Sequence, residues 1–192
     1  MQKDRLTALT DGVIAVIITI MVLELKPPHG TDLAALAASW PVFLSYVLSF
    51  IYVAIYWNNH HHFFQVVDQV DGAILWANMH LLFWLSLVPF ATAWMGEHPT
   101  AAVPAALYGG SLLMSALAWF VMQAVIIHAQ GPDSAMKRAL GRDLKSRLSV
   151  IVYLCGVGLA FVAVWAADLA YAGVALMWLI PDKRMAAAIA AD

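Results

Sequence analysis

Charged side chains are scarce in this chain of 192 residues, of which 11% are charged and 63% are hydrophobic. The mean hydropathy of +0.79 is too high for a soluble domain of this length. Ten basic residues stand against 12 acidic ones, so no excess of positive charge points to a nucleic-acid partner. The scarcity of charge therefore excludes a soluble globular domain and predicts an integral membrane protein that lies in the lipid bilayer.

Cysteine is almost absent, with Cys155 as its one representative in an apolar run. A single cysteine can form neither an internal disulfide framework nor a cysteine-based metal site, so its expected role is packing. The sequence also lacks a polar linker, a low-complexity segment and an internal repeat. These absences predict one transmembrane domain over residues 1–192.

Apolar segments that can cross a bilayer occur six times, because a membrane helix needs about 20 predominantly apolar residues, or slightly fewer at snorkelling ends. The expected spans are Leu6–Leu25, Trp40 to the histidine run at 60–62, Gly72–Met95, Val103–His128, and two shorter spans within Leu148–Ile180 that divide near Ala166-Ala167-Asp168. Pro89 predicts a kink in the third span. Six spans place both termini on one side of the membrane.

The basic residues support an even number of spans. If the N-terminus is cytoplasmic, nine of the ten basic residues lie on the inner side, as the positive-inside rule requires. They are Lys3, Arg5, Lys137, Arg138, Arg142, Lys145, Arg147, Lys183 and Arg184. The acidic residues Glu24, Asp32, Glu97 and Asp168 are then expected at outer helix ends or in outer loops. We therefore expect a multi-pass protein with both termini in the cytoplasm.

Three consecutive histidines, His60, His61 and His62, follow two asparagines at the end of the second expected span. Successive residues on a helix point about 100° apart, so the three imidazoles cannot close on one metal ion. A chelating pair needs a spacing of three or four, which the run does not contain. The pattern favours interfacial histidines that hydrogen-bond between helices.

Two alternatives for the histidines stay open at this point. An imidazole that is partly buried can titrate near neutral pH, which would make the run a pH sensor. His80 in the third span and His128 at the end of the fourth could together hold a haem in a small membrane redox enzyme.

Asp11 is an ionisable residue inside the first span, and such residues are costly unless they serve a function or meet a partner. Arg5 precedes it by six residues, a spacing that does not suit a direct pair on one helix. Each is therefore expected to pair with a neighbouring helix, either as a structural clamp or at an ion-binding site. The candidate partners are Asn58, Asn59, His60, His61, His62, Asn78 and His80.

Val16, Thr19, Ile20 and Leu23 share one face of the first expected helix. By periodicity alone this stripe favours a packed or lipid-facing surface, because the residues around it are apolar as well.

The first span nevertheless resembles a known family. RLTALTDGVIA at residues 5–15 and TIMVLEL at 19–25 are similar to the first helix of bacterial members of the transmembrane protein 175 family of potassium channels, whose signature there is R-x-x-x-F-S-D. YWNNHH at 56–61, LVPF at 87–90 and WLIPDKR at 178–184 extend the resemblance over nearly the whole chain. Leu9 and Thr10 replace the Phe and Ser of the signature, which keeps an apolar side chain and a hydroxyl.

The resemblance implies an all-α membrane protein with six transmembrane helices per subunit, assembled as a homotetramer whose first helices line a central pore. The implied function is a potassium-preferring cation channel of a bacterial plasma membrane. The resemblance also implies that such a channel passes other monovalent cations, is not an enzyme and needs no cofactor. By position, Val16 would form the narrowest apolar ring, Thr19 the hydroxyl layer for selectivity, and Ile20 and Leu23 further apolar rings.

Physical reasoning agrees with this implication. One six-helix subunit encloses too little space for a conduit, so a pore lined by one helix needs symmetry copies around an axis. Apolar side chains that meet at the axis can close the pore by dewetting, and without a carbonyl filter only modest selectivity is expected. A network at the inner end is expected to hold the pore helix or gate it. Its members are Arg5, Thr10, Asp11, Asn58, His60, His61 and His80.

Overall fold

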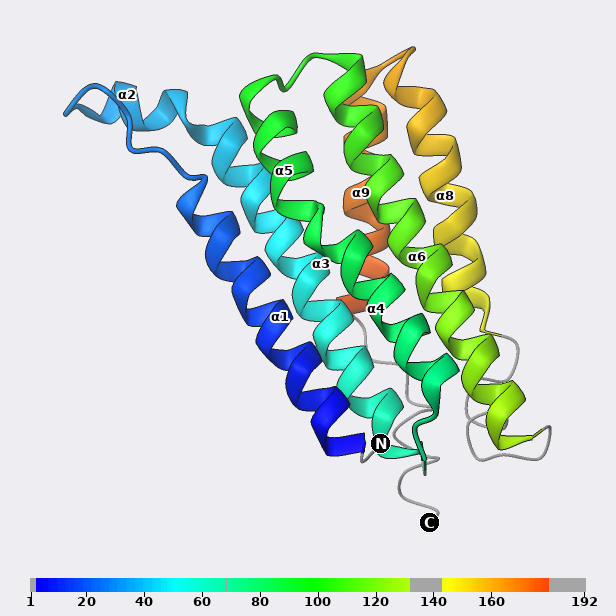
Figure 1. Cartoon of the computed structure of the whole chain (residues 1–192). Helices are drawn as coiled ribbons and strands as arrows, with labels where there is room; N and C mark the ends of the chain where they lie inside the picture. Colours follow the sequence, from blue (N-terminus) through cyan, green and yellow to red (C-terminus); the bar gives the residue numbers. More distant parts are fainter. Residues whose placement is uncertain (1–2, 68, 132–142, 180–192) are drawn as a thin grey trace.

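The computed structural model describes residues 3–67, 69–131 and 143–179, and all regular structure in these ranges is helical (Figure 1). The helices are α1 (Lys3–Leu23), α2 (Leu33–Ala38), α3 (Trp40–Gln65), α4 (Gly72–Ser86), α5 (Val88–Glu97), α6 (Ala102–Gln130), α8 (Leu144–Ala160) and α9 (Val164–Leu179). Except for α2, they run side by side up and down the molecule (Figure 1). We call the end of the bundle that holds the start of α1 the basal end, and the end that holds α2 the distal end.

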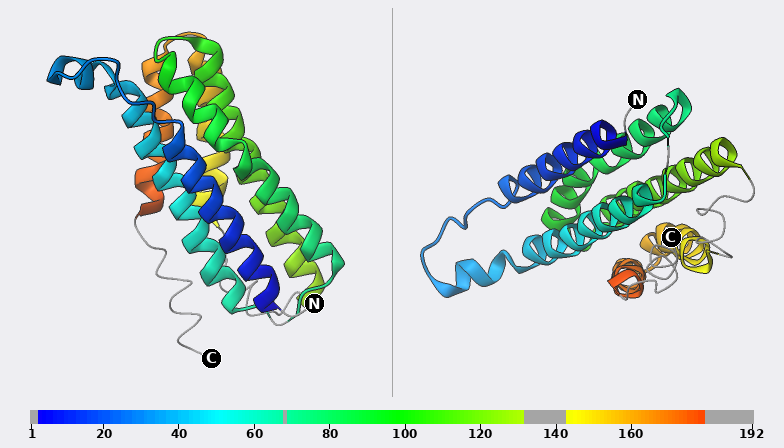
Figure 2. Two further views of the ribbon diagram at one scale, coloured as in Figure 1. Left: turned by 60° about the vertical axis from the view of Figure 1, so that its left-hand side comes forward. Right: turned by 90° about the horizontal axis from the view of Figure 1, so that it is seen from below.

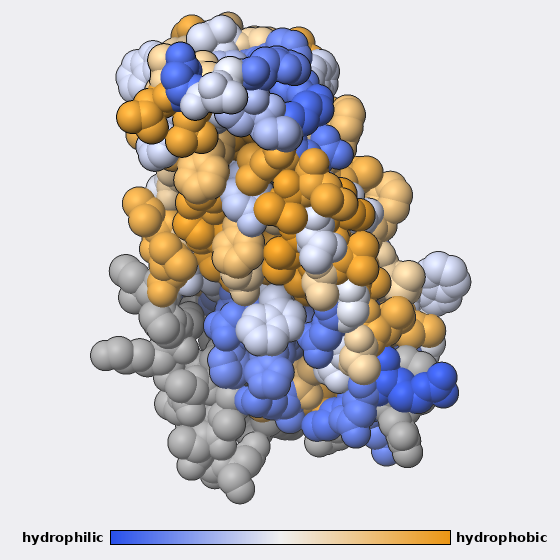
Figure 3. Space-filling view, turned by 90° about the vertical axis from the view of Figure 1, so that its left-hand side faces the viewer, coloured by the Kyte–Doolittle hydropathy of each residue, from blue (hydrophilic) through white to orange (hydrophobic). Residues whose placement is uncertain are grey.

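Four helical rods are long and apolar enough to cross a membrane: α1, α3, the α4–α5 rod at Gly72–Glu97, and α6. The shorter α9 is apolar as well. Seen from the side of α1, an apolar band crosses the middle of the molecule, with hydrophilic residues gathered toward both ends (Figure 3). These features are those of a multi-pass α-helical membrane protein. The six spans expected from the sequence would require α8 and α9 to cross the membrane as well, and these helices are only 17 and 16 residues long.

Helix α1 lies at one edge of the bundle, away from α8 and α9 (Figures 1 and 2). Its buried residues recur every three or four positions and form a single face against α3, α4 and α5. They are Leu6, Thr10, Ile14, Ile17 and Met21. Because α1 packs on one face only, the opposite face points out of the protomer.

The rod of α4 and α5 breaks at Leu87, just before Pro89. Proline lacks an amide proton and clashes with the preceding turn of a helix, so the regular hydrogen-bonding pattern stops there. The Leu87 amide instead donates to the Trp84 carbonyl three residues back, at 3.2 Å. The kink expected at Pro89 is therefore confirmed.

Tyr171 of α9 fills a notch between α6 and α8. A side chain added at Gly109 or at Gly156 would overlap the Tyr171 ring, so these two glycines allow the three helices to approach closely. The Tyr171 hydroxyl donates to the Ala105 carbonyl at 3.3 Å, and Tyr52 of α3 donates to the Tyr171 carbonyl. This cluster joins α9 to the rest of the bundle.

The turn between the last two helices lies a few residues earlier than expected. Helix α8 ends at Ala160 and α9 begins at Val164, so the turn comes a few residues earlier than Asp168. The turn Phe161–Ala163 is as apolar as its flanks and contains neither glycine nor proline. The backbone of the turn is held by hydrogen bonds from Phe161 N–H to Gly158 O and from Val162 N–H to Leu159 O. No pattern in the sequence predicts these bonds. Asp168 lies inside α9 and not in a loop.

Helix α2 was not expected at all. Its six residues, LAALAA, begin after Asp32, whose carboxylate caps the helix by accepting from the Ala35 amide at 2.7 Å. The predicted orientation in the membrane rests largely on Lys137, Arg138, Arg142, Lys183 and Arg184, which lie outside the described residues. The cytoplasmic placement of both termini therefore stays a prediction.

Candidate functional site

The expected pore residues all lie on the free face of α1. Val16 is 55% exposed, Ile20 42% and Leu23 78%, and Thr19 is exposed between them. At 100° per residue the four positions span about 100° of the helix surface. The protomer therefore presents one continuous stripe, apolar except for a single hydroxyl, on the side of the bundle where α1 is the edge.

The Thr19 hydroxyl has a defined orientation. Oγ1 donates to the Val16 carbonyl at 2.8 Å, the usual bond of a threonine to the preceding helical turn. Because the proton is committed to the helix backbone, the lone pairs of Oγ1 are free to face outward. The stripe thus offers an oxygen ligand of the kind that binds alkali cations.

A buried polar chain fixes the opposite face of α1. Asn78 of α4 donates from Nδ2 to Thr10 Oγ1 at 2.9 Å, and its Oδ1 lies 2.9 Å from His60 Nε2 of α3. Since a carbonyl oxygen only accepts, Nε2 carries the proton and donates. All three side chains are essentially inaccessible to solvent. The structure thus brings together two of the expected network residues, Thr10 and His60, through Asn78.

Asp11 has a different partner from those expected. Its Oδ1 accepts a hydrogen bond from the Trp57 indole Nε1 at 2.9 Å, near the same level of α1. His61 stacks on the Trp57 ring at a centroid distance of 6.2 Å and contacts Gln65 through Nε2. An indole N–H is a donor only, which suits a carboxylate, whereas the partners predicted for Asp11 were all asparagines and histidines.

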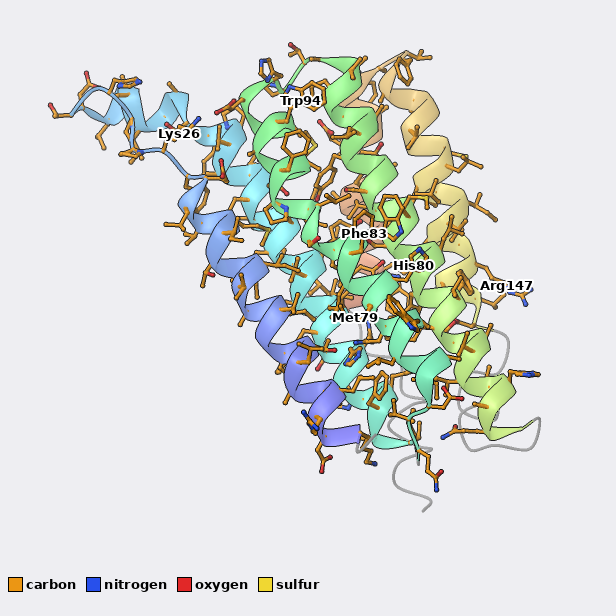
Figure 4. The ribbon with its side chains drawn as sticks, in the orientation of Figure 1. Lys26, Met79, His80, Phe83, Trp94 and Arg147 are labelled. Atoms are coloured by element: carbon orange, nitrogen blue, oxygen red, sulfur yellow. The ribbon has the colours of Figure 1, made fainter. Side chains whose placement is uncertain are left out.

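The other expected members of the network lie apart from it. Arg5 and Asn58 are exposed and make no hydrogen bond or ion pair within the described part of the chain. His80 lies with Met79 and Phe83 on the outward surface of α4, where its Nε2 accepts from Trp84 Nε1 at 2.9 Å (Figure 4). His80 therefore does not reach α1 in the protomer.

The histidines do not form a metal centre in residues 3–67, 69–131 and 143–179. No group of three or more His, Cys, Asp or Glu side chains lies close enough there to hold an ion. His80 and His128 are both exposed, on α4 and near the end of α6. The haem alternative has no support in the comparisons described below.

At the distal end of α1 an ion pair ties the following loop to α5. Lys26 Nζ lies 2.8 Å from Glu97 Oε1, and Lys26 projects from the loop that connects α1 to α2 (Figure 4). Its hydrogen bond and charge attraction to Glu97 raise the pKa of Lys26. Both groups are largely exposed, so the pair contributes little to stability and serves chiefly to position the loop.

Comparison with known proteins gives consistent matches. Residues 5–89 match the family model described as endosomal/lysosomal potassium channel TMEM175. A potassium channel of Chryseobacterium sp. (strain P1-3) is 53% identical over 185 residues, which cover 96% of each chain. A potassium channel of Streptomyces collinus is 33% identical over 84% of each chain.

A solved structure matches the fold as well. The crystal structure of a lysosomal potassium-selective channel TMEM175 homolog from Chamaesiphon minutus superposes with a TM-score of 0.81 at 30% identity. The match covers 93% of this chain and 97% of that one.

The fold defines a multi-pass α-helical membrane protein in which the edge helix α1 has one exposed face. The matches identify the family: the chain belongs to the TMEM175 family of potassium channels. The resemblance noted in the first helix and at Tyr56–His61 falls within the matched region, which ends at Pro89.

Proposed function

We propose that four copies of this chain assemble around their α1 helices and conduct potassium ions passively, in preference to sodium and other monovalent cations. The observation that carries the proposal is the free face of α1, where the Thr19 hydroxyl stands between apolar side chains. Two bacterial relatives are named potassium channels, and the solved relative is described as potassium-selective. The protein is thus a channel and not an enzyme.

Symmetry explains how an exposed stripe becomes a pore. A face that is apolar at the edge of one protomer becomes the lining of a conduit when copies of it surround an axis. Val16 would form the narrowest ring, with Ile20 and Leu23 as wider apolar rings toward the distal end. Such rings can stop conduction by dewetting without a moving plug.

Selectivity in this arrangement would come from Thr19. Its outward lone pairs would replace part of the hydration shell of a passing ion, while the apolar rings enforce partial dehydration. One hydroxyl from each subunit is a weak ligand set compared with stacked carbonyl rings, so the discrimination between potassium and sodium should be modest.

The buried chain Thr10–Asn78–His60 and the Asp11–Trp57 pair would set the rotation of α1 about its own axis. His61, stacked on Trp57, would support the second contact. Arg5, Asn58 and His80 are exposed on the protomer, so any role of theirs in holding or gating the inner end would involve a neighbouring copy.

The remaining parts of the proposal concern the whole chain. Residues 1–192 would form one channel domain with six spans, in which α8 and α9 are the last two. The protein would lie in a bacterial plasma membrane with both termini cytoplasmic. It would need no cofactor, and potassium ions would be the permeant species.

The test is potassium flux from liposomes that contain the purified protein under a potassium gradient. We expect flux from the wild type and an altered flux from Val16→Asn and from Leu23→Asn. Leu154→Asn is the matched control, because Leu154 is 62% exposed on α8, far from α1. Absence of potassium flux, or flux that both α1 substitutions leave unchanged, would overturn the pore assignment.

A further inference from the structure

A groove lies between α3 and α9, on a side of the protomer that the pore proposal does not use. Its volume is about 620 Å³ and it is open to the surroundings. Residues at helical spacing form its two walls, Leu44, Leu48 and Ile51 from α3 and Leu169, Ala172 and Leu176 from α9. The groove is large enough for a small molecule or a single hydrocarbon chain, and its walls are almost entirely apolar.

One carboxylate interrupts the apolar lining. Asp168 is the only charged residue among the described residues that line the groove. Its Oδ1 is inaccessible to solvent and meets no hydrogen-bond donor within the described residues. Trp165, 69% exposed, lines the same end of the groove, at the beginning of α9.

An unpaired carboxylate at the wall of an apolar groove is costly in a membrane protein and calls for a partner. Asp168 lines the groove and is only partly buried, so a cationic donor that enters the groove can pair with the accessible part of the carboxylate and neutralise its charge. The apolar walls between Asp168 and Leu179 would at the same time favour a hydrocarbon chain. The two features together select an amphiphile with an ammonium head and an apolar tail.

The length of the groove indicates which amphiphile fits. Asp168 and Leu179 both line it and are eleven residues apart on α9, which corresponds to about 16 Å along the helix. That is about half the thickness of a bilayer core of roughly 30 Å, so the lining has the depth of one leaflet. Exposed Trp165 at the Asp168 end is typical of the membrane–water interface.

We propose that the groove between α3 and α9 binds a membrane phospholipid whose headgroup carries an ammonium group. The ammonium donates to Asp168, one acyl chain lies against the α3 and α9 walls, and the phosphate stays in the interface. This site is separate from the α1 face and does not depend on the pore proposal.

Native mass spectrometry of the full-length protein in detergent tests the site. The protein is titrated with phosphatidylethanolamine, which carries an ammonium group, and with phosphatidylglycerol, which does not. We expect phosphatidylethanolamine to bind about tenfold more tightly to the wild type, the effect of one charge-assisted hydrogen bond. Asp168→Asn should remove this preference, and Leu176→Trp, which fills the groove, should weaken the binding of both lipids.

Two controls make the outcome decisive. Leu154→Trp places the same bulky side chain on the exposed surface of α8, outside the groove, and should bind both lipids as the wild type does. Asp4→Asn removes an exposed carboxylate at the basal end and should keep the lipid preference. The proposal is wrong if Asp168→Asn retains the preference or if Leu176→Trp binds lipid normally.

A third outcome would also overturn it. If Leu176→Trp lowers the mass of the assembly and leaves lipid binding unchanged, the groove is a contact between copies of the chain. Because the measurement records bound lipid and not ion flux, its failure leaves the channel proposal standing, and failure of the flux assay leaves this site testable.

Discussion

Asn78 of α4 donates a hydrogen bond to Thr10 of α1 at 2.9 Å, with both side chains completely buried. The same amide accepts from His60 of α3 through its oxygen. One side chain thus ties α1 to two neighbours on the face opposite Val16 and Thr19. The contact explains how a helix at the edge of the bundle keeps a fixed rotation, which a pore-lining stripe requires.

Replacing Asn78 should destabilise the protein. Asn78→Ala removes two interhelical hydrogen bonds and leaves Thr10 and His60 buried without this partner. Hydrogen bonds between membrane helices contribute about 0.6–1.7 kcal/mol each, so we expect a loss of about 1–3 kcal/mol. The measurement is the midpoint of unfolding in detergent, followed by tryptophan fluorescence.

Asn58→Ala is the matched control for this substitution. Asn58 is exposed on α3 and makes no hydrogen bond within the described residues, so its removal should change the unfolding free energy by less than about 0.5 kcal/mol. Equal effects of the two substitutions would contradict a structural role for the Thr10–Asn78–His60 chain.

The glycine notch around Tyr171 gives a second stability prediction. Gly109→Ala and Gly156→Ala each place a methyl group against the Tyr171 ring, and overpacking of this kind costs about 1–3 kcal/mol. Gly110 and Gly158 lie on the same two helices with no other atom within 4 Å of an added Cβ. Alanine there should be neutral or slightly stabilising. Thermal unfolding in detergent compares Gly109→Ala with Gly110→Ala, and Gly156→Ala with Gly158→Ala. Equal melting temperatures within either pair would contradict the close packing of Tyr171 against these glycines.

Much of the fold follows from the sequence because hydropathy and proline act locally. Apolar runs of about 20 residues predicted α1, α3, the α4–α5 rod and α6, and Pro89 predicted the break in the rod. Helix α2 and the turn Phe161–Ala163 were missed. Both are apolar segments whose boundaries depend on a cap or on backbone bonds, and not on a change in composition.

The site was predictable only in part, for a similar reason. Periodicity placed Val16, Thr19 and Leu23 on one face, but whether that face is free depends on which helices pack behind it. The partner of Asp11 depends on the rotation of α3, which brings Trp57 toward α1 and directs Asn58 elsewhere. His80 was assigned to the inner end by its depth in the membrane, yet it lies on the far side of α4.

Val16→Asn should raise the resting potassium flux severalfold. In the proposed pore Val16 forms the narrowest apolar ring, and an amide there would hold water and remove the dewetting barrier. Val22→Asn is the matched control on the same helix, because Val22 is 47% exposed but points about 120° away from Val16. Potassium flux from liposomes under a potassium gradient is measured for both variants. A larger effect of Val22→Asn than of Val16→Asn would show that another face of α1 lines the pore.

The hydroxyl of Thr19 should carry most of the discrimination between potassium and sodium. Its proton is held by the Val16 carbonyl, so Oγ1 presents only lone pairs to the free face. Thr19→Val keeps the shape of the side chain and deletes the oxygen. A hydrogen-bond-like contact contributes about 0.5–1.5 kcal/mol, so the permeability ratio should fall by roughly twofold to tenfold, toward unity.

Thr19→Ser separates the hydroxyl from the methyl group of the side chain. It retains the oxygen and the bond to the preceding turn, so the permeability ratio should stay close to that of the wild type while the pore becomes slightly wider. Reversal potentials under a potassium–sodium gradient measure the ratio in both variants. If Thr19→Val keeps its selectivity and Thr19→Ser loses it, ring diameter sets selectivity in this pore. The hydroxyl layer would then have only the structural role of capping the Val16 carbonyl.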